Sequence, residues 1–262
     1  MVHRILPAAL LASLVPAMPA TAQDAVSATG DPVPVTSPSA NAPGEVEFSL
    51  TTSFERARSG RPRRTGSVEL GLDIGLAPGL ELRLGQSAAY GSIPRAEGEG
   101  AEWGGTTSLG LRYQLAEEDG ARPAIGLLGA VRAGYGPGAT AEEVEAALLL
   151  GRTFGEGKRP LSATLNLGWT ARLDPISGER PGRYALAAAI GRAVTEDTAL
   201  VGFYAREQQE RGERDSNLLG AGLSHRLREG GPVLGVTAAA GLGRDSPALV
   251  LALAVQWQFG RE

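Results

Sequence analysis

Few residues of this chain are able to perform enzymatic chemistry. The 262 residues contain two histidines, His3 and His225, and no cysteine. Ser224 precedes His225, but adjacent residues of a strand point to opposite faces, so these two side chains cannot act as nucleophile and base. A hydrolase that pairs His225 with Ser108 or Ser216 stays open, although no feature of the sequence selects either serine. We expect no enzyme activity, no cofactor and no transition-metal site, because such metal sites need more histidine or cysteine ligands.

Charged and amide side chains that alternate with bulky apolar residues form a larger group of candidates. Residues in this pattern share the polar face of a strand. Opposite charges on neighbouring strands, such as Asp73 or Glu69 with Arg83, are expected to pair. If such pairs fill an enclosed interior they are structural, and if they line a gap they set its charge preference, as rings of charge do in channels. The candidate lining residues are Glu69, Asp73, Glu81, Arg83, Arg112, Arg132, Asn166 and Arg172.

The segments that carry these residues have a period of two, which is typical of strands with two different faces. Bulky apolar residues occupy every second position in residues 68–76, and Glu69, Gly71, Asp73 and Gly75 lie between them. The pattern returns near the end of the chain, from Leu249 to Phe259. The periodicity predicts twelve strands, within residues 46–50, 68–76, 80–84, 109–115, 123–135, 143–154, 161–169, 183–194, 199–209, 216–228, 232–243 and 249–259.

The connections between the predicted strands are of two alternating kinds. One kind is tight and rich in turn formers, at residues 77–79, 117–121, 155–160, 195–198 and 229–232. The other kind is mostly longer and polar, at residues 91–103, 136–142, 173–182 and 210–215, with short exceptions at 59–62 and 244–246. An even number of strands with unequal connections predicts an all-β fold, a transmembrane antiparallel up-and-down β-barrel of about twelve strands. Such a barrel must close, because an open strand edge cannot be hydrated in lipid.

A soluble periplasmic β-sandwich or β domain is the alternative fold, since alternation alone does not exclude it. Aromatic residues near the predicted strand ends favour the membrane barrel, because such residues form girdles at membrane interfaces; they are Trp103, Tyr135, Trp257 and Phe259. The apolar stripe of each strand would then face lipid.

The N-terminal region is expected to lie outside the barrel. Residues 1–22 have a basic start, an apolar stretch and a small-x-small site at Ala20–Ala22, which is typical of a secretory signal peptide cleaved after Ala22. Residues 23–44 are rich in Pro, Ser and Ala and predict a flexible lead-in. A plug inside the barrel is the alternative for this segment, and the shortage of bulky residues argues against it. Residues 45–262 would form the barrel.

Several stretches of the sequence resemble the outer-membrane proteins of the MetA-pathway-of-phenol-degradation family. The resemblance is carried by GGTTSLGLRYQLAEEDGARPAIGLLGAVRAGYG at 104–136, by VELGLDIGLAPGLELRL at 68–84 and by LSATLNLGWTARL at 161–173. The family's usual Pro-Thr-Gly after the long strand is replaced by the residues 134–137, Gly-Tyr-Gly-Pro. The chain also continues past Phe259, whereas barrels often end on the aromatic residue. The resemblance implies a barrel that passes small hydrophobic or aromatic compounds.

The sequence therefore predicts a monomeric barrel in a Gram-negative outer membrane that lets small molecules diffuse through its lumen, with loops 91–103 and 173–182 as gates. Its expected partners are outer-membrane lipid, a small-molecule solute and the barrel-assembly machinery, which would recognise the C-terminal strand. Nucleic acid is not an expected partner, because the formal net charge is −4. A closed structural barrel is the second hypothesis, and a lipid-modifying enzyme is the third.

Overall fold

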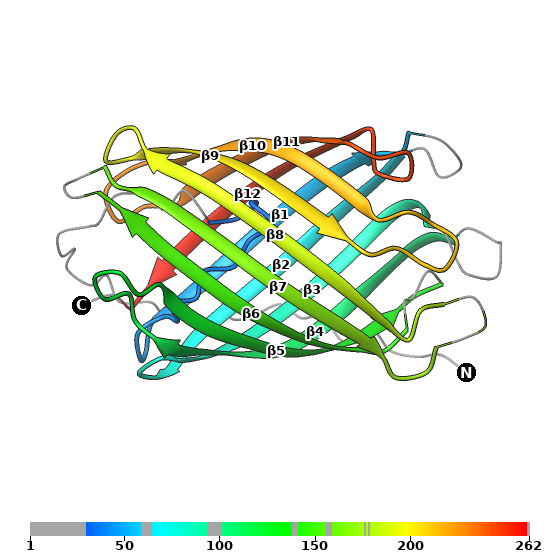
Figure 1. Cartoon of the computed structure of the whole chain (residues 1–262), viewed down its shortest axis with the longest axis horizontal. Coiled ribbons are helices and arrows are strands. Elements are labelled where there is room, and N and C mark those ends of the chain that lie inside the picture. The colour runs from blue at the N-terminus through cyan, green and yellow to red at the C-terminus, as the bar shows by residue number, and fades with distance from the viewer. Residues whose placement is uncertain are drawn as a thin grey trace, which may run out of the picture.

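The computed structural model describes residues 30–58, 64–93, 101–137, 141–155, 159–175, 177 and 179–260. The predicted signal peptide therefore lies outside the described residues. The described residues form twelve strands: β1 (Val46–Arg56), β2 (Arg64–Ala77), β3 (Leu80–Ile93), β4 (Ala101–Ala116), β5 (Ala124–Tyr135), β6 (Glu143–Phe154), β7 (Leu161–Arg172), β8 (Gly182–Ala193), β9 (Thr198–Glu207), β10 (Ser216–Arg226), β11 (Val233–Gly241) and β12 (Leu249–Phe259). Each strand pairs antiparallel with its neighbours in the chain (Figure 1). Within the described ranges, no helix is long and apolar enough to cross a membrane.

The barrel closes where β1 pairs with β12. The register runs from Val46 opposite Phe259 to Arg56 opposite Leu249. We call the end of the barrel with the Val46–Phe259 pair the near end and the opposite one the far end. The near end carries tight turns, of which Pro78-Gly79 joins β2 to β3 in two residues. Gly79 has a φ of 74°, a conformation that glycine adopts without steric cost. The predicted closed twelve-stranded antiparallel barrel is confirmed.

The apolar stripe of each strand points away from the barrel interior. Along β12, Leu251 and Leu253 are 42% and 50% exposed, whereas Ala254 is fully buried. Leu109, Leu111 and other large apolar residues are similarly exposed. A continuous apolar outer surface of this kind requires contact with hydrocarbon, because soluble monomers rarely expose apolar patches beyond a few hundred Å². Tilted aromatic pairs lie near both ends, with ring centroids 5.7 Å apart for Phe48–Trp257 and 6.4 Å apart for Trp103–Tyr135.

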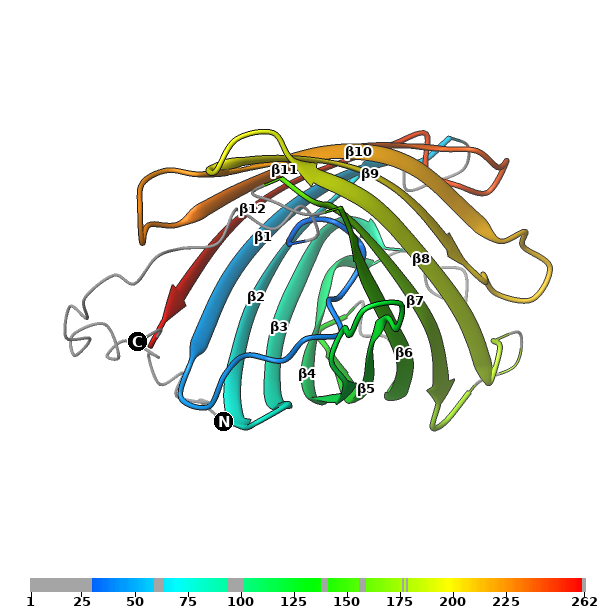
Figure 2. The ribbon, with the colours of Figure 1, turned by 60° about the vertical axis from the view of Figure 1, so that its left-hand side comes forward.

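Residues 30–44, which we call the inner segment, lie inside the barrel instead of forming the predicted flexible lead-in. Figure 2 shows this segment, in dark blue, crossing the interior before it enters β1. Val33 and Val35 are each only 7% exposed. The prediction was wrong for these residues because it was based on the composition of the segment alone, which has too few bulky residues to form a hydrophobic core of its own. The wall of the barrel supplies the surface against which a short apolar stretch is buried.

Two predicted loops are shorter than expected. β3 continues to Ile93 and β4 begins at Ala101, so both flanks of the predicted loop 91–103 belong to strands. Tyr90 pairs with Trp103 in this region. β8 begins at Gly182, the last residue of the predicted loop 173–182. The gating role predicted for these loops stays untested, and the segment that occupies the lumen of the barrel comes from the N-terminal side of β1.

Candidate functional site in the barrel lumen

A polar cavity of about 340 Å³ lies between the inner segment and the strands β1 to β6. Residues 31–34 and Thr36 of the inner segment form one side of the cavity. Its charged lining comprises the carboxylates of Asp31, Glu69, Asp73 and Glu145 and the guanidinium groups of Arg83 and Arg132. Ser49, Thr51 and Ser108 add hydroxyl groups. The cavity therefore presents more negative than positive charge to a solute.

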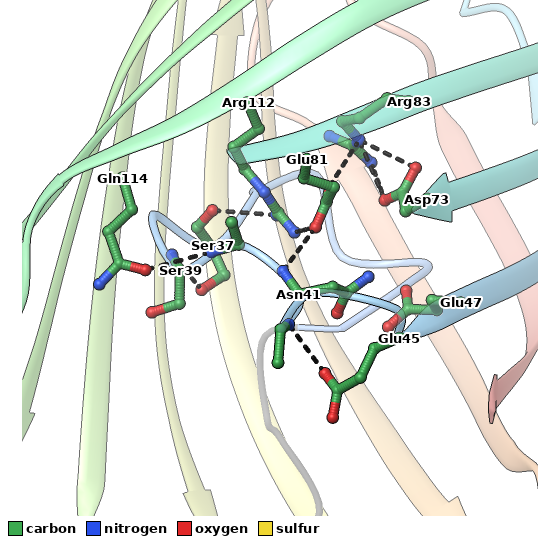
Figure 3. A network of polar contacts seen from close by, with 12 residues as sticks. Ser37, Ser39, Asn41, Glu45, Glu47, Asp73, Glu81, Arg83, Arg112 and Gln114 are labelled. Atoms are coloured by element: carbon green, nitrogen blue, oxygen red, sulfur yellow. Dashed lines mark hydrogen bonds and ion pairs between the residues drawn. The ribbon is translucent and has the colours of Figure 1, made fainter. Parts of the chain in front are cut away.

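A chain of ion pairs joins β2, β3 and β4 beside this cavity, as Figure 3 shows. Arg83 forms an ion pair with Asp73 at 3.0 Å, and its Nε also lies 3.7 Å from a carboxylate oxygen of Glu81. Glu81 is fully buried and pairs with Arg112, which is 7% exposed. The predicted contact of Arg83 is thus made with Asp73 and not with Glu69. Buried charges require such pairing, because an isolated charge inside a protein is costly.

The same ion pairs hold the inner segment (Figure 3). Arg112 donates a hydrogen bond to the carbonyl of Ser37 at 3.1 Å. The backbone N–H of Asn41 donates to Glu81 at 2.8 Å. The backbone N–H of Ala40 donates to the side chain of Gln114 at 3.3 Å. Glu81 and Arg112 were predicted to line the lumen. In the structure they fix the inner segment instead and are not part of the cavity lining.

Arg132 and Glu69 do line the cavity, and they differ in their partners. Arg132 forms an ion pair with Glu145, and the Arg132 side chain is 43% exposed. Among the contacts found within the described residues, Glu69 has no hydrogen bond and no ion pair, and it is exposed to the lumen. Asp31 of the inner segment lines the same cavity as Glu69. Burial raises the pKa of the Asp31 carboxyl, and the nearby Arg83 guanidinium and a hydrogen bond with Ser49 oppose this rise.

Arg172 belongs to a second ionic cluster at the far end. Its guanidinium contacts Glu143 at 3.2 Å, Glu179 at 3.2 Å and Glu210 at 2.8 Å. Arg183 joins the cluster through Glu143 at 2.7 Å. Glu143 and Arg172 face each other across β6 and β7. This cluster connects the wall to the residues that follow β7 and β9, so Arg172 serves the far rim and not the cavity.

Asn166, on β7, contacts the inner segment through its side-chain amide. The amide donates to the carbonyl of Thr36 at 3.1 Å and accepts from the backbone N–H of Thr36 at 2.6 Å. This pair of hydrogen bonds resembles the contact between two strands. Asn166 therefore holds the inner segment against the wall, as Arg112 does on the other side of the lumen.

The wall opposite the cavity is apolar. Val33 and Val35 of the inner segment belong to a buried cluster with Ala189, Ala199, Val201, Phe203 and Ala239. These residues lie on β8, β9 and β11. The lumen thus has a charged wall on β1 to β6 and an apolar wall on β8 to β11, and the inner segment lies against the apolar wall with its two valines.

Glycines on the inner face of the barrel make room for the inner segment. A Cβ atom added at Gly126 would lie 2.7 Å from the Pro38 carbonyl, and one at Gly151 would lie 2.8 Å from the Pro38 side chain. Added Cβ atoms at Gly75 and Gly235 would collide with the carbonyls of Ala42 and Asp31. Glycine permits this close approach of two backbones. The alternating pattern of the sequence places such glycines on the polar face of several strands, but it did not indicate that a segment of the chain lies against them.

His225 lies outside the lumen. It shares the outward face of β10 with Leu223, is exposed, and its Nδ1 is 3.0 Å from the Thr198 hydroxyl. Within the described residues, no group of three or more His, Asp or Glu side chains is arranged to hold a metal ion.

No known protein family matches the sequence, and no curated protein matches it with significance. Solved structures do match the shape of the chain. An outer-membrane channel from Pseudomonas putida F1 superimposes with a TM-score of 0.59 and 15% identity, over 84% of this chain and 97% of the channel. The KdgM porin superimposes with a TM-score of 0.57 and 11% identity, over 82% of this chain and 99% of the porin. The chain has the fold of outer-membrane porins. At these identities the porin fold alone is shared, so the function has to be argued from the lumen.

Proposed function

We propose that this porin-fold protein is an outer-membrane channel through which small solutes diffuse along the charged wall of β1 to β6. The observation that carries the proposal is the polar cavity between this wall and the inner segment, about 340 Å³ in volume. Water and a small polar solute fit a space of this kind, because its lining supplies carboxylates, guanidinium groups and hydroxyls. The apolar outer surface supports a location in lipid.

The charge of the lining supports a preference for cations. Four carboxylates face two guanidinium groups around the cavity. Both guanidinium groups are already paired, Arg83 with Asp73 and Arg132 with Glu145. Asp31 and Glu69 are the two carboxylates of the lining that form no ion pair within the described residues, and Glu69 is the exposed one that would attract a passing cation. Charged rings of this kind set the selectivity of channels, because they lower the free energy of one sign of ion inside a narrow, weakly hydrated space.

Small hydrophobic or aromatic molecules are a second candidate class of solute. This finer proposal follows from the resemblance to the family of phenol-degradation outer-membrane proteins. The apolar wall, with Val201 and Phe203, supports it, since such a surface suits a solute that is poorly hydrated. Val33 and Val35 cover this wall in the structure. Hydrophobic solutes would therefore need the inner segment to move, whereas small cations would not.

We also propose that the chain is exported to the outer membrane and that residues 1–22 are cleaved off after Ala22. Outer-membrane lipid would cover the apolar stripes. The assembly machinery would recognise β12, whose outward residues include Trp257 and Phe259. The alternative is a closed structural barrel without transport.

Solute flux distinguishes a channel from a closed structural barrel. The purified protein is placed in liposomes loaded with an impermeant osmolyte, and swelling is followed by light scattering after transfer to isotonic solutions of glycine, arginine or glutamate. A channel should give swelling rates well above those of empty liposomes, and faster swelling with cationic arginine than with glutamate. Swelling no faster than that of empty liposomes for every solute would favour the closed barrel.

A further inference from the structure

The inner segment consists of two parts that are held in different ways. Residues 36–44, which we call the stalk, are fixed by directional polar contacts along their length. Asn166 binds the backbone of Thr36, Arg112 binds the carbonyl of Ser37, and Glu81 accepts from Asn41. At the end of the stalk, the N–H of Gly44 donates to the carbonyl of Gly75 at 2.9 Å. The stalk thus has hydrogen bonds to four different strands.

Residues 30–35, which we call the gate, are held by apolar packing of two valines and by a hydrogen bond between Asp31 and Ser49 on β1. Val33 and Val35 contact the apolar wall of β8, β9 and β11. The backbone hydrogen bonds of these two valines are made within the gate itself, from Val33 to Gly30 and from Val35 to Val33. Apolar contacts have no preferred direction. Displacement of the gate from the wall would break the contact of Asp31 with Ser49 but none of the hydrogen bonds that fix the stalk.

The position of the gate determines how much of the lumen is open. Residues 31–34 form one side of the polar cavity, and the apolar wall lies on the other side of the gate. Displacing the gate would join the cavity to the space now filled by its two valines. The joined space would have a charged wall and an apolar wall. The lumen would then accept solutes larger than the present cavity.

We propose that residues 30–35 are a gate that swings off the apolar wall of β8, β9 and β11 while residues 36–44 stay fixed, and that this movement widens the passage. The proposal rests on the proposed channel function, because a gate requires a passage to control. This gate lies on the N-terminal side of β1, whereas the gates predicted from the sequence are the loops 91–103 and 173–182. The wall of the barrel is shaped to fit the resting position of the inner segment, because Gly126 behind the stalk and Gly235 behind the gate leave room where a larger residue would collide with it.

Movement of the gate is tested first by cysteine labelling, which reports the exposure of a thiol and does not depend on a measurable channel current. The chain has no cysteine, so single thiols can be introduced one at a time. Val35→Cys places the thiol in the gate, and Pro38→Cys places it in the stalk, with both positions buried in the resting structure. We expect a water-soluble maleimide to label the Val35→Cys protein at least tenfold faster than the Pro38→Cys protein. Equal, slow labelling at both positions would overturn the gate.

A reversible disulfide between the gate and β12 then tests whether movement of the gate changes the open probability of the channel. A Cβ atom added at Gly30 would lie 2.8 Å from the side-chain oxygen of Gln256 on β12, so Gly30→Cys and Gln256→Cys introduce two neighbouring thiols. Oxidation of the double variant should lower the open probability in planar bilayers at least fivefold, and a thiol reductant should restore it. Val35→Asp, which opposes burial on the apolar wall, should raise it. The open probability of the single Gly30→Cys variant should not change on treatment with the same oxidant.

The outcomes separate the gate from the channel. If oxidation and reduction of the double variant give the same current, and Val35→Asp also leaves it unchanged, the gate is overturned while the channel stands. If the thiol of the Val35→Cys protein reacts rapidly but no variant carries current, the channel function is overturned, and the role of the movement as a gate falls with it. Rapid labelling of the Val35→Cys protein, together with a current that falls on oxidation of the double variant and recovers on reduction, supports both proposals.

Discussion

Replacing Arg112 with glutamate should lower the free energy of unfolding by about 3–5 kcal/mol, because it removes one partner of a buried ion pair. The new carboxylate would face Glu81, which is fully buried, and the carbonyl of Ser37 would lose its hydrogen bond. We expect the stalk to leave its position and the conductance to rise, so the variant is less stable and more open. Denaturant unfolding in lipid vesicles, followed by tryptophan fluorescence, measures the loss of stability.

Arg132→Glu is the matched control for this substitution. Arg132 is also a lumen arginine paired with a glutamate, but its side chain is 43% exposed and it does not hold the inner segment. Exposed ion pairs contribute about 0–1 kcal/mol, so this variant should unfold almost as the unchanged protein does. Combining Arg112→Glu with Glu81→Arg should recover part of the lost stability, because opposite charges face each other again. Equal losses for Arg112→Glu and Arg132→Glu would contradict the anchoring role of Arg112.

Replacing Leu253 with arginine should destabilise the barrel in a bilayer by about 2–4 kcal/mol, the cost of a cation on the lipid face near the middle of a membrane. Leu253 lies in the middle of β12, points outward and is 50% exposed. Its surroundings are expected to be hydrocarbon, which solvates a guanidinium group poorly. The measurement is the free energy of unfolding in vesicles of defined lipid composition.

Leu253→Ala serves as the control, because alanine shortens the side chain but leaves it apolar, so it should be tolerated far better than arginine. The comparison also tests the location of the protein. On a soluble domain, an arginine at a half-exposed position costs little, since water solvates the charge. If Leu253→Arg and Leu253→Ala had the same small effect in vesicles, the outer surface would not face lipid.

The strands were predictable because the two faces of each strand meet different surroundings. Where an outward stripe of bulky residues is present, as in residues 68–76 and 249–259, the period of two identified the strand. It failed at the start of β4, where residues 101–108 include few bulky apolar side chains. There the strand is formed by pairing with β3, for example between Tyr90 and Trp103, which is a contact between distant residues.

The ion pairs could not be predicted in full, because they depend on the pairing register of β2 and β3, which was not evident from the sequence. The tight turn at Pro78-Gly79 alone would place Asp73 opposite Leu84. An irregularity in the register between Gly75 and Ala77 shifts the pairing by one residue, so that Asp73 lies opposite Arg83. A shift of one residue exchanges the two faces of a strand, and the bulge restores the match between polar faces. Glu69 consequently lies opposite Ser87 and has no cationic partner across the strand pair.

A position of residues 30–44 inside the barrel was only the alternative prediction, because the burial of this segment depends on surfaces far away in the sequence. Residues 30–44 contain two valines and little other apolar surface, which is too little for a core of their own. The barrel provides the remainder, through the apolar wall and through Gly126 and Gly151, which admit Pro38. Composition describes what a segment does alone in water, and here the segment lies inside a lumen formed by the rest of the chain.

The most direct test of the central claim, that solutes pass along the charged wall, is the reversal potential of the reconstituted protein across a salt gradient in a planar bilayer. The unchanged protein should be cation-selective. Glu69→Lys changes the lining from four carboxylates and two cationic groups to three of each, so its cation preference should largely disappear. Glu229→Lys, in an exposed turn at the near end, is the control and should leave the potential unchanged. A reversal potential that indicates anion preference, or that does not respond to Glu69→Lys, would contradict the proposed path.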